Sequence, residues 1–397
     1  MKLFIISSRF PYPLEKGDKL RLYYQIQELS KYFEIVLCCL TDQVVSELGM
    51  TRLRPYCRSI HVFRLHKYSV FFQVVKNYFN GLPAQVSYFL NPGIKEKIKD
   101  LIRSESPDHI YCQLIRAAEY VKDYPLPKTL DYMDCFSLST YKRALNTSVW
   151  TRWFWNLESR LLKKYELAVY TSFNQHTIIS SIDASYISGD NKDIPFTLVS
   201  NGLDQRFLKD ANATRDIDIL FFGNLSYFSN INAVEFLIKE ILPALKRRNK
   251  TLRIMIAGAQ PEKSLIKLIG YHPDSVTLQA NVIDAKVIYK RAKIFVAPIT
   301  LGTGQQNKVL EAIASGCEVV CSEDVSAGLP GLINYISLAS SPDEYAELII
   351  KKWDSFDQNR TLRNKAKDFV KENFSWEKNT APLVELIKTT KLHLGPI

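Results

Sequence analysis

Short apolar runs alternate with longer amphipathic stretches along the chain. Leu3–Ser7 and Glu34–Leu40 are predicted to be buried strands, with Asp18–Lys31 as the helix between them. This order of strand, helix and strand predicts α/β architecture, in which helices cover both faces of a parallel sheet. The other expected strands are Ser59–Leu65, His109–Cys112, Thr129–Tyr132, Arg253–Ala257, Ser275–Gln279, Ile294–Ala297 and Glu318–Cys321, and the other expected helices are Val70–Phe79 and Thr380–Leu392.

The second half of the chain repeats the pattern. Asp216–Phe222 is predicted to be a strand, and Ile231–Lys246 a helix with apolar side chains at helical spacing. Two such halves in 397 residues predict two Rossmann-like domains, because a chain of this length exceeds one ordinary core. The polar stretch Leu203–Arg215 lacks periodicity and is interpreted as the linker. The expected domains are 1–203 and 204–375, followed by a helical tail, 376–397.

Composition narrows the class of protein. No apolar run reaches the roughly 18 residues that cross a bilayer, and Met1–Ile6 runs directly into a strand pattern without a signal-peptide cleavage site, so we expect a cytoplasmic protein. The seven cysteines show no C-x-x-C pair and no zinc-ligand spacing, and are interpreted as reduced core residues. The net charge of +11 favours anionic partners, although solubility alone would also account for it.

Gly302–Gly316 is the most informative segment. A strand ending near Pro298 leads into a loop with glycines and then a helix, whose N-terminus exposes main-chain N–H groups and the positive end of its dipole. This arrangement suits a diphosphate. Lys308 would add a positive charge, and Glu311 would accept hydrogen bonds from ribose hydroxyls. The alternative is an ordinary connection with Lys308 solvated and Glu311 on the helix surface.

The same segment resembles the family-4 retaining glycosyltransferases, which have the GT-B fold. That family carries a Glu-x7-Glu pattern in its C-terminal domain; here the second glutamate is Glu311, and Thr303 occupies the first position. Gly304–Ala312 is closer to the G-x-Q-N-K-V-L-E-A stretch of the exosortase-associated (PEP-CTERM) sugar transferases of bacteria. The missing first glutamate is therefore interpreted as a trait of that branch.

Further positions extend the resemblance over most of the chain. Ser200–Asp204 resembles the N-G-V-D element between the domains, and Phe222–Tyr227 with Asn230 resembles the stretch that opens the donor domain. Phe374–Trp376 resembles the point where the last helix returns to the first domain. The family's Arg/Lys pair after the glycine of the donor domain is missing, which places more of the phosphate recognition on Lys308.

The resemblance implies two Rossmann-like domains facing across a cleft, with the C-terminal helix crossing back to the first domain. It also implies transfer with retention of anomeric configuration, without a metal or cofactor. The expected catalytic residues are Lys308, Glu311 and Asp134. The expected donor-binding residues are Asn201, Gly223, Asn224, Gly258, Gly302, Thr303, Gly304, Gln305, Gln306, Asn307 and Val309.

The acceptor is expected to bind the N-terminal half. Pro11–Arg21 follows the first strand and corresponds to a glycine-rich loop of the family, although it also reads as an ordinary loop. Asp131–Ser137 resembles the branch's D-x-x-D-x-x-S stretch, in which Asp134 would bind sugar hydroxyls or deprotonate the acceptor. Alternatively, Asp134 is a helix N-cap. His109 is interpreted as structural or surface, so no catalytic histidine is assigned. The expected acceptor-side residues are Gly17, Arg21, Gln113 and Arg116.

Two segments suggest contact with a membrane. Trp150–Lys164 and Lys67–Phe79 mix aromatic and basic residues, as helices at an anionic bilayer interface do, although one face could instead pack into the core. We expect a peripheral protein at the inner face of the plasma membrane that binds a nucleoside-diphosphate sugar and a lipid-linked or oligosaccharide acceptor in cell-surface polysaccharide assembly. No signature of nucleic-acid binding is present in the sequence.

Two other functions remain as alternatives. The first is a catalytically silent GT-B protein that acts as a membrane-associated scaffold or regulatory partner. Thr303 and the missing Arg/Lys pair are the two features that favour this alternative. The second is a nucleotide-sugar epimerase, which would need acids and a histidine on both sides of the sugar that the sequence does not show.

Overall fold

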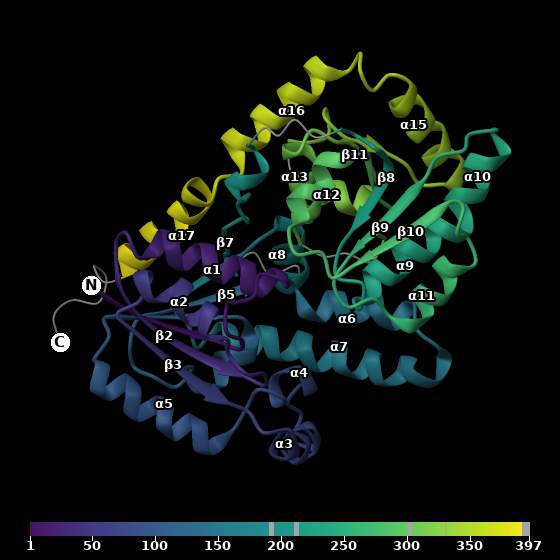
Figure 1. Cartoon of the computed structure of the whole chain (residues 1–397). Coiled ribbons are helices and arrows are strands. Elements are labelled where there is room, and N and C mark those ends of the chain that lie inside the picture. The colour runs from purple at the N-terminus through teal and green to yellow at the C-terminus, as the bar shows by residue number, and fades with distance from the viewer. Residues whose placement is uncertain (190–193, 210–213, 301–303, 330, 391–397) are drawn as a thin grey trace. The chain divides into compact units, whose positions relative to one another are not determined.

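The computed structural model describes residues 1–189, 194–209, 214–300, 304–329 and 331–390. The chain divides into two compact units (Figure 1). The first unit holds Met1–Asn201 and the C-terminal helix α17 (Trp376–Thr390), and the second holds Gly202–Ser375. The division after Asn201 lies two residues before the expected boundary at 203.

The described residues of the first unit form a parallel sheet in the order β3-β2-β1-β4-β5-β6-β7. The strands are β1 (Lys2–Ser7), β2 (Glu34–Thr41), β3 (Ser59–Arg64), β4 (His109–Gln113), β5 (Lys128–Met133), β6 (Gln175–Ile178) and β7 (Thr197–Leu198). The helices are α1 (Gly17–Leu29), α2 (Glu47–Leu53), α3 (Lys67–Phe79), α4 (Ala84–Ser87), α5 (Pro92–Glu105), α6 (Phe136–Leu145), α7 (Val149–Tyr170) and α8 (Ser181–Ser188), with 3-10 turns η1 (Arg54–Tyr56) and η2 (Ile115–Tyr120).

The core of the first unit lies on both faces of this sheet. Side chains of β1 alternate between the two faces, so that Phe4 joins the cluster that includes residues of α5 and Ile5 joins the cluster that includes residues of α1. Helix α17 adds apolar side chains, among them Leu383, to the α1 face. The Trp376 ring stacks on Tyr24 of α1 with their centroids 5.1 Å apart. The tail therefore completes the core of the first unit.

The second unit also contains a parallel sheet, whose described strands follow the order β10-β9-β8-β11-β12-β13. They are β8 (Ile217–Phe222), β9 (Ile254–Gly258), β10 (Val276–Ala280), β11 (Ala292–Ala297), β12 (Glu318–Cys321) and β13 (Ser337–Leu338). The helices are α9 (Phe228–Phe236), α10 (Leu242–Arg247), α11 (Lys263–Gly270), α12 (Ala285–Arg291), α13 (Asn307–Ala314), α14 (Glu323–Ala327), α15 (Pro342–Asp354) and α16 (Arg360–Asn373), with a 3-10 turn η3 (Gln205–Phe207).

The expected helix over Ile231–Lys246 exists, but it is interrupted. Between α9 and α10 the chain forms a π-helical turn, η4 (Leu237–Ile241). Pro243 follows this turn. Because proline has no N–H to donate, it disturbs the regular hydrogen-bond ladder of an α-helix where it occurs. The sequence pattern predicted the buried face and not this change of helix type.

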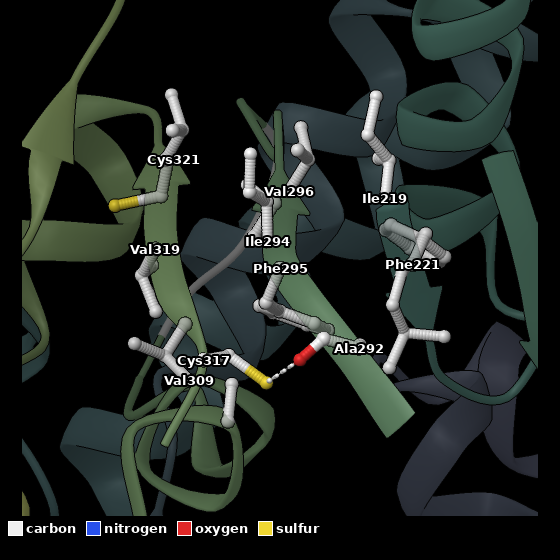
Figure 2. Close-up of a cluster of buried hydrophobic side chains, with 14 of the residues drawn as sticks. Ile219, Phe221, Ala292, Ile294, Phe295, Val296, Val309, Cys317, Val319 and Cys321 are labelled. Atoms are coloured by element: carbon white, nitrogen blue, oxygen red, sulfur yellow. Dashed lines mark hydrogen bonds between the residues drawn. The ribbon is translucent and has the colours of Figure 1, made fainter. Parts of the chain in front are cut away.

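Figure 2 shows the core of the second unit, where β8, β11 and β12 meet α13. Phe295, Val309 and Val319 are fully buried in it, and the Cys317 thiol donates to the carbonyl of Ala292 at 3.5 Å. Six of the seven cysteines are buried, Cys57 is half-buried, and all seven are free thiols, as predicted. The α/β class with two Rossmann-like units is thus confirmed. Among the described helices, none combines the length and apolar character needed to span a bilayer.

Candidate functional site

Two glycines meet at the carboxyl edge of the sheet in the second unit. Gly223 follows β8, and Gly258 is the last residue of β9. Gly258 has φ +144°, and a Cβ there would lie 1.7 Å from the carbonyl oxygen of Gly223. Neither the conformation nor the space admits a side chain. Ligands of doubly wound sheets bind at this edge, so the glycines leave bare main chain where a ligand is expected.

Lys308 lies beside these glycines. Its Nζ donates to Asn230 Oδ1 at 2.6 Å, and Asn230 Nδ2 donates in turn to the carbonyl of Asn224 at 2.7 Å. A Cβ on Gly223 would lie 2.9 Å from Asn230 Nδ2 and 3.3 Å from Lys308 Nζ. The structure therefore brings together Gly223, Asn224, Gly258 and Lys308, four of the predicted residues, and it adds Asn230 as the residue that positions the ammonium group.

Asn224 has a donor without a partner. Its Oδ1 accepts from the main-chain N–H and the hydroxyl of Ser226, at 3.0 and 2.7 Å, which fixes the side-chain amide. Asn224 Nδ2 is buried, and no described residue accepts its hydrogens. A buried donor without an acceptor costs about 1–3 kcal/mol. An acceptor oxygen of a bound ligand would remove this cost.

Helix α13 supplies the positive end of its dipole to the same site. Its N-cap, Gln306, makes no side-chain capping bond. Lys308 and Glu311 are half-buried on its first turns. Burial lowers the pKa of Lys308 to about 8, although Glu311 acts to raise it. Burial raises the pKa of Glu311 to about 7, against the opposing effects of Tyr289 and Lys308. Both groups consequently change charge close to neutral pH.

The remaining predicted donor residues have different positions. Gly304, Gln305, Gln306 and Asn307 are half-buried and lead into α13, whereas the Val309 side chain is fully buried in the core, so only its main chain could contact a ligand. Gly302 and Thr303 lie outside the described residues. Gly328, which the sequence did not indicate, packs so closely on this loop that a Cβ would lie 2.4 Å from the carbonyl oxygen of Gly304.

The structure places both Arg21 and Asn201 in the interior of the first unit. Arg21 is fully buried and makes a bidentate ion pair with Asp131, at 2.8 Å from Nε and 3.0 Å from Nη2. Its Nη1 donates to the carbonyl of Val199 and to Asn201 Oδ1, both at 2.8 Å. Asn201 belongs to the first unit and is 2% exposed. The assignment of Arg21 to the acceptor side is wrong, because its guanidinium is buried and hydrogen-bonded to residues of the first unit. The side-chain oxygen of Asn201 accepts one of these hydrogen bonds.

The other acceptor-side residues lie at the carboxyl edge of the first sheet. Gly17 begins α1, and Gln113 ends β4 and donates to the carbonyl of Asp18 at 2.8 Å. Arg9 pairs with Asp18 at 2.6 Å. Burial acts to raise the pKa of Asp18, but Arg9 lowers it overall. Arg116 donates to Gln85 Oε1 at 2.7 Å, and its guanidinium lies 4.5 Å from the Phe136 ring centroid. This edge is polar and carries both signs of charge.

Asp134 follows β5 at the same edge. It is not the helix N-cap that was considered as an alternative, because Cys135 caps α6 by accepting from the N–H of Leu138. Burial and the neighbouring carboxylate of Asp183 raise the pKa of Asp134 well above its usual range. A carboxyl group with a raised pKa is better suited to take a proton near neutral pH.

The histidine of β4 is structural, as predicted. His109 is buried, and its Nε2 shares a hydrogen bond of 2.9 Å with the hydroxyl of Thr129. Burial lowers its pKa to about 4. Within the part of the chain that the structure describes, no group of three or more His, Cys, Asp or Glu side chains is placed to hold a metal ion.

The second unit matches a known protein family. Residues 216–354 match the family model described as Glycosyl transferases group 1. This match spans β8, β9, the Lys308 site and all of α15. A curated protein of Klebsiella pneumoniae, described as an uncharacterized 44.6 kDa protein in the cps region, is 23% identical over 95% of this chain and 97% of its own length. An uncharacterized glycosyltransferase of Methanocaldococcus jannaschii is 26% identical over 41% of this chain and 43% of its own length.

Solved structures confirm the GT-B fold for nearly the whole chain. Sucrose-phosphate synthase from Thermosynechococcus elongatus matches with a TM-score of 0.72 and 14% identity, covering 99% of this chain and all of that structure. HepE of Anabaena in complex with UDP matches with a TM-score of 0.68 and 12% identity, over 98% of this chain and all of that structure. The family match and the fold together support the conclusion that the protein is a glycosyltransferase.

Proposed function

We propose that this protein transfers a glycosyl group from a nucleoside-diphosphate sugar to an acceptor, and that the donor diphosphate binds at Lys308. The observation that carries the proposal is the assembly of Lys308, Asn230 and bare glycine main chain at the N-terminus of α13. Structural relatives add support, since HepE was crystallised with UDP and with UDP-glucose. The resemblance to family-4 enzymes motivates the further proposal of retention.

The residues of the second unit would act on the leaving group. The protonated Lys308 amine and the α13 N-terminus stabilise negative charge that builds on the diphosphate during bond cleavage. Asn224 Nδ2 donates to a phosphate oxygen, and Gly223 and Gly258 let the ligand approach the main chain. Glu311 accepts hydrogen bonds from ribose hydroxyls. On the first unit, Asp134 is positioned at a sheet edge to take the proton of the acceptor hydroxyl.

The acceptor is proposed to be lipid-linked, because the first unit exposes an aromatic face. This aromatic face consists of Phe71, Phe72, Phe79, Trp150 and Trp153, which are between 66% and 88% exposed. Tyr78 of α3 stacks on Phe154 of α7 with centroids 6.0 Å apart, so the two helices that carry these exposed side chains are in contact. Exposed Lys76 and Arg152 accompany the aromatic face. Aromatic and basic side chains together bind the interface of an anionic bilayer. The opposite face of α7 packs into the core, which is the alternative considered for this segment.

Removal of the aromatic face should release the protein from membranes. For the triple variant Phe72→Ala, Trp150→Ala and Trp153→Ala, we expect flotation with phosphatidylglycerol vesicles to fall by at least about tenfold, since each ring removes apolar contact with the bilayer. The matched control is Tyr271→Ala with Ile283→Ala, which removes exposed apolar side chains of the second unit. Equal flotation of native protein and triple variant would contradict the membrane proposal.

Binding of a nucleoside diphosphate should weaken at alkaline pH. Lys308 is charged below its pKa of about 8 and loses its charge above it, so the affinity for UDP should fall by up to about tenfold per pH unit above pH 8. Lys308→Arg stays cationic, so its profile should be flatter in this range. Calorimetric titration with UDP between pH 6.5 and 9.5 measures the affinity of the native protein and of Lys308→Arg. A native affinity independent of pH would refute the role of Lys308.

Transfer itself is tested by release of nucleoside diphosphate. UDP-, GDP- and ADP-sugars are supplied with a detergent extract of lipid-linked glycans, and the anomeric configuration of the product is read by NMR. We expect release from one donor class and a product with the configuration of the donor. Donor binding without any release, over all donors and extracts, would favour the catalytically silent scaffold. Inversion in the product would overturn retention alone.

A further inference from the structure

A cavity lies in the unit that carries Lys308. It encloses about 220 Å³, and its charged lining is cationic. The wall of the cavity includes Ser315 and Gly316. None of the lining residues in the described part of the unit is an aspartate or glutamate. The six lining cations are Lys209, Arg215, Lys290, Arg360, Arg363 and Lys367. We call this feature the basic pocket.

The basic pocket lies at the opposite edge of the sheet from Lys308. Arg215 comes just before β8, Lys290 precedes β11, and Ser315 comes between α13 and β12, so all three are at the amino-terminal edge. Gly223 and Gly258 are at the carboxyl edge of the same sheet. Helix α13 joins the two edges and packs against α16. Its eight residues separate the sites by about 12 Å along the helix axis.

Two arginines of the pocket are held in fixed positions. Arg215 donates to the carbonyl of Ser315 at 2.7 Å and to the carbonyl of Ala292. Gly316 has φ +79°, and a Cβ there would lie 2.7 Å from Arg215 Nη2, so the glycine leaves room for the guanidinium. The Arg363 guanidinium lies 3.7 Å from the Phe356 ring centroid. These contacts organise the guanidinium groups before any ligand arrives.

Three of the lining cations lie close together on α16. Arg360, Arg363 and Lys367 follow each other at spacings of three and four on α16, where like charges repel. Lys290 is only 8% exposed, and its Nζ donates to the carbonyl of Lys209, another lining residue. Glu318, outside the lining, lies 3.9 Å from Arg363 and pairs more closely with Lys352, at 2.9 Å.

An unpartnered hydroxyl supplies an independent observation. Ser315 is 6% exposed, and its Oγ has no hydrogen-bond partner among the described residues. Its carbonyl is occupied by Arg215. A buried hydroxyl in a cationic wall is a ready donor to an anionic oxygen, and an oxyanion ligand would satisfy it.

We infer that the basic pocket binds a phosphoryl group, and so forms an anion site separate from the donor site. Guanidinium and ammonium groups with a hydroxyl are the donors that phosphate oxygens accept. A volume of 220 Å³ is below the roughly 300–1,000 Å³ of pockets for whole small molecules. The pocket therefore fits a phosphate or diphosphate head, carried either by a soluble phosphorylated metabolite or by an anionic lipid.

The test is calorimetric titration of the full chain with inorganic pyrophosphate. In the double variant Arg360→Glu and Lys367→Glu we expect the pocket affinity to fall by at least tenfold. Glutamate at the first residue of α16 is compatible with the helix dipole, so this variant should fold; Arg360→Ala with Lys367→Ala serves if it does not. The control, Lys365→Glu, reverses one charge on α16 outside the lining and should bind as the native protein does.

Lys308→Ala separates the basic pocket from the donor site. Pyrophosphate binding that persists in Lys308→Ala and is lost in the double variant supports the basic pocket. No binding to the native protein, or loss in Lys308→Ala with the double variant unchanged, overturns it. Flotation with phosphatidic acid vesicles then identifies the source of the phosphate. A decrease in the double variant relative to Lys365→Glu indicates a lipid headgroup, and unchanged flotation with lost pyrophosphate binding indicates a soluble ligand.

Discussion

Lys308→Ala is expected to lower the rate of glycosyl transfer by about 10²–10³-fold, the usual loss when a donor to developing negative charge is removed. The ammonium group is aimed by Asn230 at 2.6 Å and lies beside Gly223, where the diphosphate is proposed to leave. The residues that directly follow Gly223 include no Arg or Lys, so no neighbouring cation is expected to replace it. Nucleoside-diphosphate release under saturating donor measures the effect.

Two variants make this prediction specific. Lys308→Arg keeps the charge and should retain part of the rate, whereas Lys263→Ala removes an exposed lysine of the second unit and should leave the rate unchanged. If folded Lys308→Ala works within a few-fold of the native rate, the charge of Lys308 does not stabilise the leaving diphosphate.

Arg21→Ala is expected to destabilise the first unit by about 3–5 kcal/mol, because it leaves a buried carboxylate without its cation. Asp131 is completely buried, and its two carboxylate oxygens accept hydrogen bonds from Nε and Nη2 of Arg21. Thr177 donates to the same carboxylate at 2.8 Å, which is insufficient to replace an ion pair. Urea unfolding followed by circular dichroism measures the loss of free energy of unfolding.

An exposed pair provides the control for Arg21. Arg103 and Asp100 on α5 lie 3.5 Å apart with both side chains largely in solvent, so Arg103→Ala should change the free energy of unfolding by less than about 1 kcal/mol. A change of similar size in Arg21→Ala would show that the buried pair does not stabilise the unit.

The strands could be predicted closely because parallel strands are apolar on both faces. β2 and β12 begin at the predicted residues, and β8 ends at the predicted residue. The short edge strands β7 and β13, of two residues each, carry too little pattern to be recognised. The role of Arg21 was mispredicted for a different reason. Its position after a glycine-containing loop suggests a ligand, and the buried partner that claims it, Asp131, lies 110 residues away in the chain.

The candidate site was predictable where it is local. Gly223, Gly258 and Lys308 follow strands in the order expected of a doubly wound domain, so their convergence follows from topology. The orientation of Lys308 by Asn230 depends on side-chain geometry that no spacing reveals. The basic pocket was not predictable from any one segment, because its cations come from separate parts of the chain. The net charge of +11 showed only that anionic partners were favoured.

Calorimetric titration of native protein, Lys308→Ala and Lys263→Ala with UDP-, GDP- and ADP-sugars tests the central claim, that Lys308 binds the donor diphosphate. We predict saturable binding of one donor class to the native protein and to Lys263→Ala, and an affinity at least tenfold weaker in Lys308→Ala, as expected for loss of a charged hydrogen bond. Equal affinity of one donor for all three proteins would contradict the claim and move the donor site away from Lys308.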